Sequence, residues 1–97
     1  MMNHNQDFEI NKISFNNIGL NYLDKSLYNL ALDNFMKALD LMRNLKWKVQ
    51  VVDVLANIGL IYSNKKEYQQ ALDFSEKSLE LRKELKTHNP KSKALLP

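Results

Sequence analysis

The chain lacks cysteine altogether and has very little glycine and proline. Its 97 residues include no Cys, two Gly and two Pro. Without cysteine it can form neither a disulfide framework nor a thiolate metal site, and this composition favours a reducing cytoplasm. Between the two glycines, Gly19 and Gly59, there is no helix breaker and no Asn-Gly hairpin turn. A chain with so few breaks is predicted to be helical.

Long apolar runs are also missing. The N-terminal stretch MMNHNQDFEI is polar and has neither the basic start nor the apolar run of a signal peptide. No apolar stretch approaches the roughly 20 residues needed to span a bilayer. The net charge is +3, but Lys and acidic residues alternate except near the basic C-terminus. Because no aromatic stacking platform accompanies that basic stretch, we expect no binding to nucleic acid. The missing signal peptide and membrane span lead us to expect a cytoplasmic protein that does not bind a membrane.

The usual residues of enzyme sites are scarce. The two histidines, His4 and His88, lie in the terminal segments with no metal-ligand partner at helical spacing and no Ser/Asp companion. Most carboxylates alternate with Lys at helical spacing, a pattern typical of solvated outer faces. There is no glycine-rich phosphate loop. The sequence therefore predicts no enzyme, no metal site and no cofactor.

The sequence does contain one motif that occurs twice. Residues 17–28 read NIGLNYLDKSLY, and residues 57–68 read NIGLIYSNKKEY. A shift of forty positions aligns residues 17–46 with residues 57–86, and about half of the aligned positions are identical. A fixed period of this size is the signature of a stacked repeat protein.

The apolar residues recur every three or four positions, the period of one helix face. They predict helices at about 8–24, 28–45, 48–64 and 68–87. One polar break separates the two helices within each repeat, and Ser26 in the first break or Asn64 in the second could cap a helix. Since no breaker separates Leu45 from Val49, the second and third helices could also continue as one. The predicted segments are residues 1–11 (N-terminal segment and start of the first helix), 12–46 (first repeat), 47–87 (second repeat) and 88–97 (tail).

The repeated phrase resembles the tetratricopeptide repeat, whose pattern is W-x2-L-G-x2-Y…A-x3-F. The first copy reads Phe15-x2-Ile18-Gly19-x2-Tyr22 and then Ala31-x3-Phe35; the second reads Leu55-x2-Ile58-Gly59-x2-Tyr62 and then Ala71-x3-Ser75. The period is forty rather than 34, and the closing proline is missing. That longer period is similar to the subclass of kinesin light chains, G-protein-signalling modulators and bacterial sensory kinases. The resemblance implies an all-α fold: two tandem antiparallel helix-turn-helix repeats, a fragment of an α-solenoid.

The residues that carry the motif are interpreted as structural. A glycine inside a helix costs about 0.8–1.0 kcal/mol relative to Ala, so its recurrence suggests a neighbour too close for a Cβ. We expect that neighbour to be Ala31 for Gly19 and Ala71 for Gly59. The tyrosine rings are expected to fill the hairpins. The structural set is Gly19, Tyr22, Tyr28, Ala31, Gly59, Tyr62, Tyr68 and Ala71.

The resemblance also implies a binding groove, lined by the first helix of each repeat. Asn17 and Asn57 precede the Ile-Gly step, and in the longer-period relatives such asparagines form a ladder that holds the backbone of an extended peptide. An equally open interpretation is that an Asn-rich chain repeats them without function. By the same resemblance, the groove set is Asn17, Asn57, Leu20, Leu60, Asp24, Asn64, Ile13 and Asp53. The carboxylate clamp of other family members is not expected, because Leu20 and Leu60 lie where a clamp has basic or Asn residues.

Two functional hypotheses follow. In the first, the chain is a protein-interaction module that binds an extended peptide of a partner in the groove. In the second, it is a structural or oligomerisation module that stacks on itself as a homo-oligomer or belongs to a larger sensory or signalling array. A polar, Asn-lined groove favours the first hypothesis. The missing caps of an array with two repeats favour the second, because about three repeats are usually needed for stability.

Overall fold

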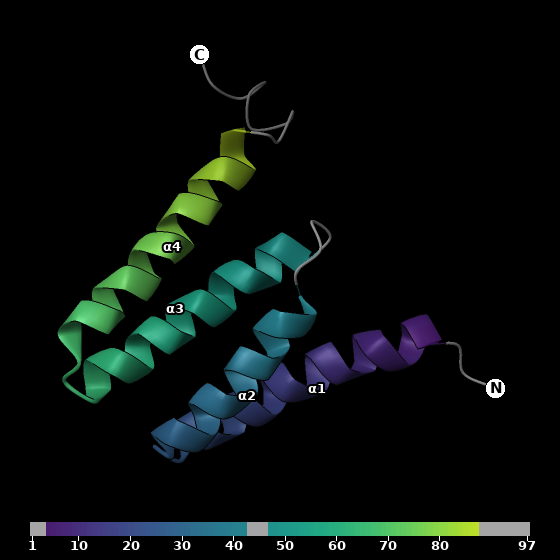
Figure 1. Cartoon of the computed structure of the whole chain (residues 1–97), viewed down its shortest axis with the longest axis horizontal. Coiled ribbons are helices and arrows are strands. Elements are labelled where there is room, and N and C mark those ends of the chain that lie inside the picture. The colour runs from purple at the N-terminus through teal and green to yellow at the C-terminus, as the bar shows by residue number, and fades with distance from the viewer. Residues whose placement is uncertain (1–3, 43–46, 88–97) are drawn as a thin grey trace.

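The computed structural model describes the backbone of residues 4–42 and 47–87 and the side chains of residues 14–42 and 47–86. Four helices account for most of them: α1 (His4–Asp24), α2 (Tyr28–Leu41), α3 (Lys48–Asn64) and α4 (Tyr68–Thr87) (Figure 1). No strand occurs in this part of the chain, so the all-α prediction is confirmed. None of the helices described is both long and apolar enough to cross a membrane.

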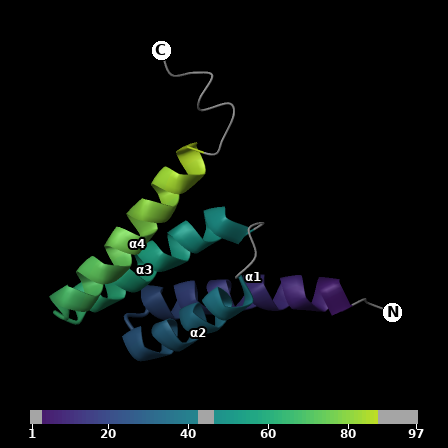
Figure 2. The same ribbon diagram turned by 45° about the horizontal axis from the view of Figure 1, so that its top comes forward.

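The helices form two hairpins. α1 packs on α2, α3 packs on α4, and α2 packs on α3, so the two hairpins are joined through their inner helices (Figures 1 and 2). The second and third helices are therefore separate, and they run side by side in opposite directions. This arrangement confirms the prediction of two tandem helix-turn-helix units.

The observed ends of α3 and α4 agree with the sequence prediction, but those of the first repeat differ. α1 already begins at His4, and α2 ends at Leu41 rather than at residue 45. At that end the Met42 amide donates to the carbonyls of Ala38 (2.9 Å) and Leu39 (3.1 Å), which tightens the last turn. No glycine or proline marks this end in the sequence. The predicted tail, residues 88–97, lies outside the described residues.

The turn inside each hairpin is held by backbone hydrogen bonds. The Ser26 amide donates to the Leu23 carbonyl (2.9 Å), and the Leu27 amide donates to the Tyr22 carbonyl (2.9 Å), the pattern of a Schellman motif. Ser26 has φ 59°, and Lys66 has φ 65° at the equivalent place in the second turn. Glycine is the residue usually found at this left-handed position. Each turn therefore has the conformational cost of a non-glycine residue with positive φ, and the residue types in the turns do not predict it.

The predicted side-chain caps are wrong. Ser26 occupies the left-handed turn position, and the residue that precedes α2 is Leu27, which makes no side-chain capping bond. Asn64 is the last residue of α3 rather than the residue before α4. The backbone bonds of these turns satisfy carbonyl groups at the ends of α1 and α3.

The core lies where the two hairpins meet. Its buried residues come from both inner helices: Ala31, Phe35 and Ala38 on α2, Met42 directly after it, and Val54, Ile58 and Ile61 on α3. All of them are at most 2% exposed. Tyr22, Tyr28 and Tyr62 are partly buried against this cluster, as predicted for motif tyrosines. Tyr68 differs, because 65% of its surface is exposed.

Each glycine has a close neighbour across its hairpin. A Cβ built on Gly59 would lie 2.8 Å from the Ser75 hydroxyl and 3.3 Å from the Ala71 carbonyl oxygen, so Ala71 is near, as expected. A Cβ on Gly19 would instead meet the Phe35 ring, with two ring carbons at 2.8 Å. The neighbour that excludes a side chain at Gly19 is therefore an aromatic ring and not Ala31.

Candidate protein-binding surface

The predicted groove residues lie on one face of each repeat's first helix. Positions 13, 17, 20 and 24 of α1 are spaced by four, three and four residues, and positions 53, 57, 60 and 64 repeat that spacing on α3. Six of these residues are exposed, namely Asn17, Leu20, Asp24, Asp53, Leu60 and Asn64, and Asn57 is half-buried. The side chain of Ile13 is not among those described.

The side-chain amides of the two predicted groove asparagines, Asn17 and Asn57, form no hydrogen bond within the part of the chain that the structure describes. Each amide offers a carbonyl acceptor and an NH2 donor, the complement of a peptide unit. Leu20 and Leu60, 37% and 50% exposed, add apolar surface one turn further along.

The four groove positions on α1 and the four on α3 do not form one contact cluster in the structure. Among the described residues, the closely packed helix pairs are α1–α2, α2–α3 and α3–α4, and α1–α3 is not one of them. The groove residues therefore form two matched faces on neighbouring hairpins. A ligand that used both would cross from α1 to α3.

Asn16, next to Asn17, is the one side chain of the surrounding surface with an unusual environment. Its Oδ1 is buried and has no hydrogen-bond partner. Leaving a buried acceptor unpaired costs about 1–3 kcal/mol. The second repeat has Ala56 at the equivalent position, so this cost is confined to the first repeat. Neither the composition nor the apolar periodicity of the sequence predicts this buried, unpaired oxygen.

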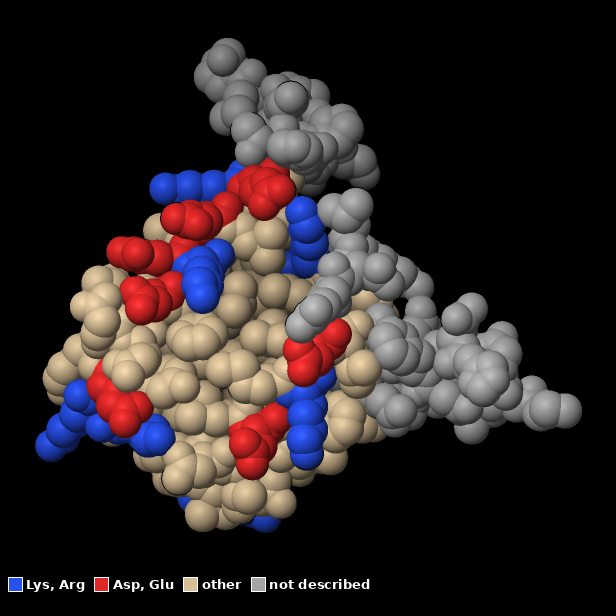
Figure 3. Space-filling model, in the orientation of Figure 1, with Lys and Arg blue, Asp and Glu red and all other residues tan. Residues whose placement is uncertain are grey.

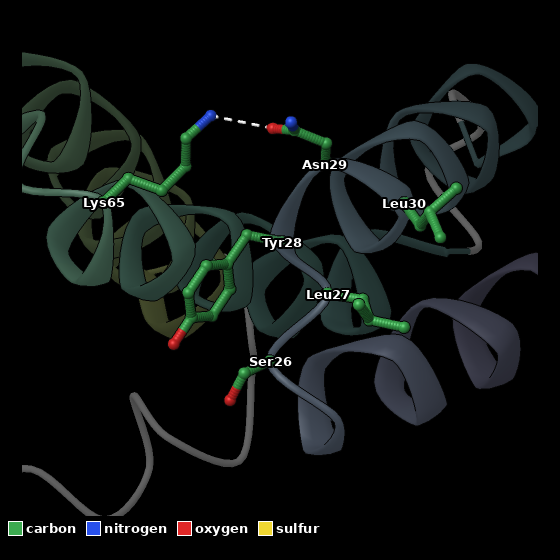
Figure 4. Close-up of a pocket in the computed structure, with 6 residues that line it drawn as sticks. All are labelled: Ser26, Leu27, Tyr28, Asn29, Leu30 and Lys65. Carbon is green, nitrogen blue, oxygen red and sulfur yellow. Dashed lines mark hydrogen bonds between the residues drawn. The ribbon is translucent and has the colours of Figure 1, made fainter.

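A hollow of about 330 Å³ lies where the two repeats meet, lined by Ser26, Leu27, Tyr28, Asn29, Leu30 and Lys65 (Figure 4). The Lys65 ammonium donates a 2.8 Å hydrogen bond to the Asn29 side-chain oxygen across it. This bond joins the end of α3 to the start of α2. Because the ammonium is already bound, the hollow is better explained as a joint between hairpins than as an anion site. None of its residues belongs to the predicted groove.

Charged side chains gather towards the edges of the face seen in Figure 3 and leave an uncharged area across its middle. The ion pairs of this surface include Lys48 with Glu84 at 3.2 Å and Lys65 with Glu67 at 4.0 Å. Pairs this exposed contribute little stability, about 0–1 kcal/mol. The uncharged surface, rather than the charges, is the feature that suits a protein partner.

Comparison with known proteins agrees with the repeat geometry. The sequence matches the family model of the tetratricopeptide repeat over residues 13–84. It matches no curated protein and no solved structure. Because the family match spans most of the chain and both helix hairpins, the chain belongs to the tetratricopeptide-repeat family, whose repeats form non-catalytic scaffolds that generally mediate protein–protein interaction.

Proposed function

We propose that this chain binds an extended segment of a partner protein across the exposed faces of α1 and α3. Asn17 and Asn57 hold the backbone of that segment, and Leu20 and Leu60 contact its side chains. The observation that carries the proposal is the match between repeats: Leu20 and Leu60 are exposed at equivalent positions of both helices, each three residues after an asparagine.

The exposure of Leu60 is not a result of loose packing. On the same helix Ile58 and Ile61, its near neighbours in sequence, are fully buried in the core. α3 is thus firmly seated on α2, and Leu60 is exposed because of the face on which it lies. A leucine kept in water at equivalent places in two repeats contributes nothing to folding. Its apolar surface becomes favourable when a ligand covers it, at about 25 cal/mol per Å².

The forty-residue period further supports the backbone-holding role of the asparagines. We place the chain in the longer-period subclass of the family on that period. An asparagine before the Ile-Gly step of each repeat places one amide group on α1 and one on α3, and each amide can pair with a peptide unit of an extended ligand. Such recognition reads backbone more than sequence, so specificity is expected to come from Leu20, Leu60 and the acidic group of Asp24.

The test is a peptide selected against the chain from a random display library and then titrated against variants. Replacing both Asn17 and Asn57 with Ala should weaken that peptide's binding roughly tenfold or more, since each lost hydrogen bond costs about 0.5–1.5 kcal/mol. Melting curves should stay the same or rise slightly, because Ala is the better helix former. Asn21→Ala is the matched control: it changes an exposed asparagine of α1 outside the groove set.

Two results would contradict the proposal. Unchanged affinity in the Asn17/Asn57 double variant would remove the asparagines from the binding site. A marked loss of stability in that variant would show that they are structural.

A further inference from the structure

The first helices of the two repeats carry charge of one sign on their groove faces. Among the side chains described for α1 and α3, the charged ones are Asp24, Asp53 and Lys48. The Lys48 ammonium lies 3.2 Å from a carboxylate oxygen of Glu84 on α4 and is paired there. The described groove residues therefore include two carboxylates and no cation, although the whole chain has a net charge of +3.

Both carboxylates are accessible to a ligand. Asp24 and Asp53 are exposed, and neither side chain forms a hydrogen bond or an ion pair with another described residue. This includes Lys25, which follows Asp24 directly and is exposed as well. The two negative charges are thus not neutralised within the part of the chain that the structure describes.

The charge of Asp24 is not explained by the stability of its helix. Asp24 is the last residue of α1, and no basic residue lies in the last turn of that helix. A carboxylate at a helix C-terminus is unfavourable, because the helix dipole is negative at that end. The second repeat has the neutral Asn64 at the equivalent place, so the fold does not require an acid there. A ligand explains this charge better than folding does.

The two carboxylates lie at different levels along the groove faces. α1 and α3 both run towards the end of the molecule that holds the two hairpin turns (Figure 1). Asp24 is at that end of α1, whereas Asp53 lies eleven residues (53 to 64) before the last residue of α3. Eleven residues of helix rise about 16 Å, the length of about five residues of extended chain. A segment that meets both carboxylates therefore crosses obliquely from the first half of α3 to the end of α1.

We propose that the partner segment is basic, with one Lys or Arg that pairs with Asp24 and a second that pairs with Asp53, at least about five residues apart in extended chain. The inference rests on the proposed function, because this is the segment that Asn17 and Asn57 hold. Apolar side chains between the two basic ones contact the leucines of the groove set. Lys and Arg both suit these sites, since a carboxylate accepts charge-assisted hydrogen bonds from either. An acidic segment is disfavoured, because it would bring like charges together.

The test uses peptides selected against the full chain from a random display library at physiological salt. Selected peptides should contain two Lys or Arg residues at least ~5 positions apart. One such peptide is then titrated against a double variant, Asp24→Asn with Asp53→Asn, which removes both charges and keeps the side-chain shapes. At low salt this variant should bind roughly fivefold or more weakly than the wild type. The difference should nearly vanish in about 1 M salt, where the Debye length is about 3 Å.

Asp33→Asn is the matched control, because it removes the same charge from an exposed residue of α2 outside the groove set. It should leave the affinity for the peptide unchanged. Melting curves show whether each variant is folded. Asp24→Asn should melt at the same temperature as the wild type or slightly higher, because a charge that opposes the helix dipole is removed.

A charge exchange assigns each contact to one end of the peptide. Asp24→Lys should weaken binding, and replacing one terminal basic residue of the peptide with Glu should restore the affinity for that variant. The same Glu peptide should bind the wild type more weakly than the original peptide does. With Asp53→Lys, the basic residue at the opposite end of the peptide should be the one whose replacement restores binding.

Failure of this inference is distinguishable from failure of the proposed function. If Asn17→Ala with Asn57→Ala weakens binding and the Asp24/Asp53 double variant does not, the groove holds a segment that is not basic, and the inference is wrong. If neither double variant loses affinity, the peptide binds elsewhere and both proposals are wrong. Loss in the Asp24/Asp53 variant alone would support the acidic contacts and remove the asparagines from the site. Selected peptides without two basic residues, or an equal loss in Asp33→Asn, would also overturn the inference.

Discussion

Replacing Gly19 with Ala should destabilise the protein, although Ala is the better helix former. Removing a glycine from a helix interior gains about 0.8–1.0 kcal/mol. Against this, the new Cβ would lie 2.8 Å from two carbons of the Phe35 ring. That ring is fully buried and cannot swing into solvent. Overpacking of such a site costs about 1–3 kcal/mol, so the expected net loss is about 1 kcal/mol.

The measurement is urea unfolding followed by far-UV circular dichroism, with melting curves beside it. A loss of about 1 kcal/mol lowers the melting temperature of a chain of this size by roughly 4–8 °C. Gly59→Ala is the matched control. Its closest neighbour is the Ser75 hydroxyl, which can rotate away, so its stability should change less than that of Gly19→Ala.

A double-mutant cycle separates the ring contact from other effects. Phe35→Leu removes the ring carbons that face Gly19, so in that background Gly19→Ala should cost at least ~0.5 kcal/mol less. If Gly19→Ala alone proves as stable as the wild type, the close approach of α1 to α2 at this glycine is not a constraint. If the cost is the same in both backgrounds, Phe35 is not its source.

Three further predictions concern stability. Lys66→Gly should stabilise by about 0.5–1 kcal/mol in chemical unfolding, because Lys66 has φ 65° and Gly adopts that conformation without strain, whereas Lys66→Ala should gain nothing. Asn16→Ala should raise the free energy of unfolding by about 1 kcal/mol or more, since it removes a buried unpaired oxygen. Asn17→Ala, at an exposed residue, should gain only the difference in helix propensity. Equal gains in the two variants would show that the Asn16 side chain is solvated. Lys48→Ala with Glu84→Ala should show a coupling of at most ~1 kcal/mol that falls with added salt, and a larger, salt-independent coupling would contradict an exposed pair.

The sequence was sufficient to predict the helices, and for a definite reason. Repetition of an apolar pattern with little Gly or Pro leaves the backbone few alternatives, and α3 and α4 begin and end where predicted. The end of α2 could not be predicted because no Gly or Pro follows Leu41 to mark it. The left-handed Ser26 was missed for a related reason. Its conformation is imposed by the geometry of the hairpin against the preference of the residue.

The predicted groove residues remain a proposal, because exposure shows only that they are available. Sequence comparison between the repeats indicates which positions match, but the Phe35–Gly19 contact and the buried Asn16 oxygen depend on which side of a helix meets its neighbour. A shift of about 100° around the helix, one residue, changes that side. The three- and four-residue spacing of apolar residues in the sequence does not resolve a shift of one residue.

One such shift accounts for the main difference between the two hairpins. In the first repeat the aromatic residue of α2 is Phe35, which faces Gly19 and fills the core. In the second repeat the aromatic lies one position earlier, at Phe74, and its ring stacks on Tyr62 with centroids 5.6 Å apart. Moving the ring around the helix leaves Ser75 at the place opposite Gly59. The hollow of about 270 Å³ lined by Ala56, Ser75, Ser78, Leu79 and Arg82 therefore lies where the first repeat has the Phe35 ring.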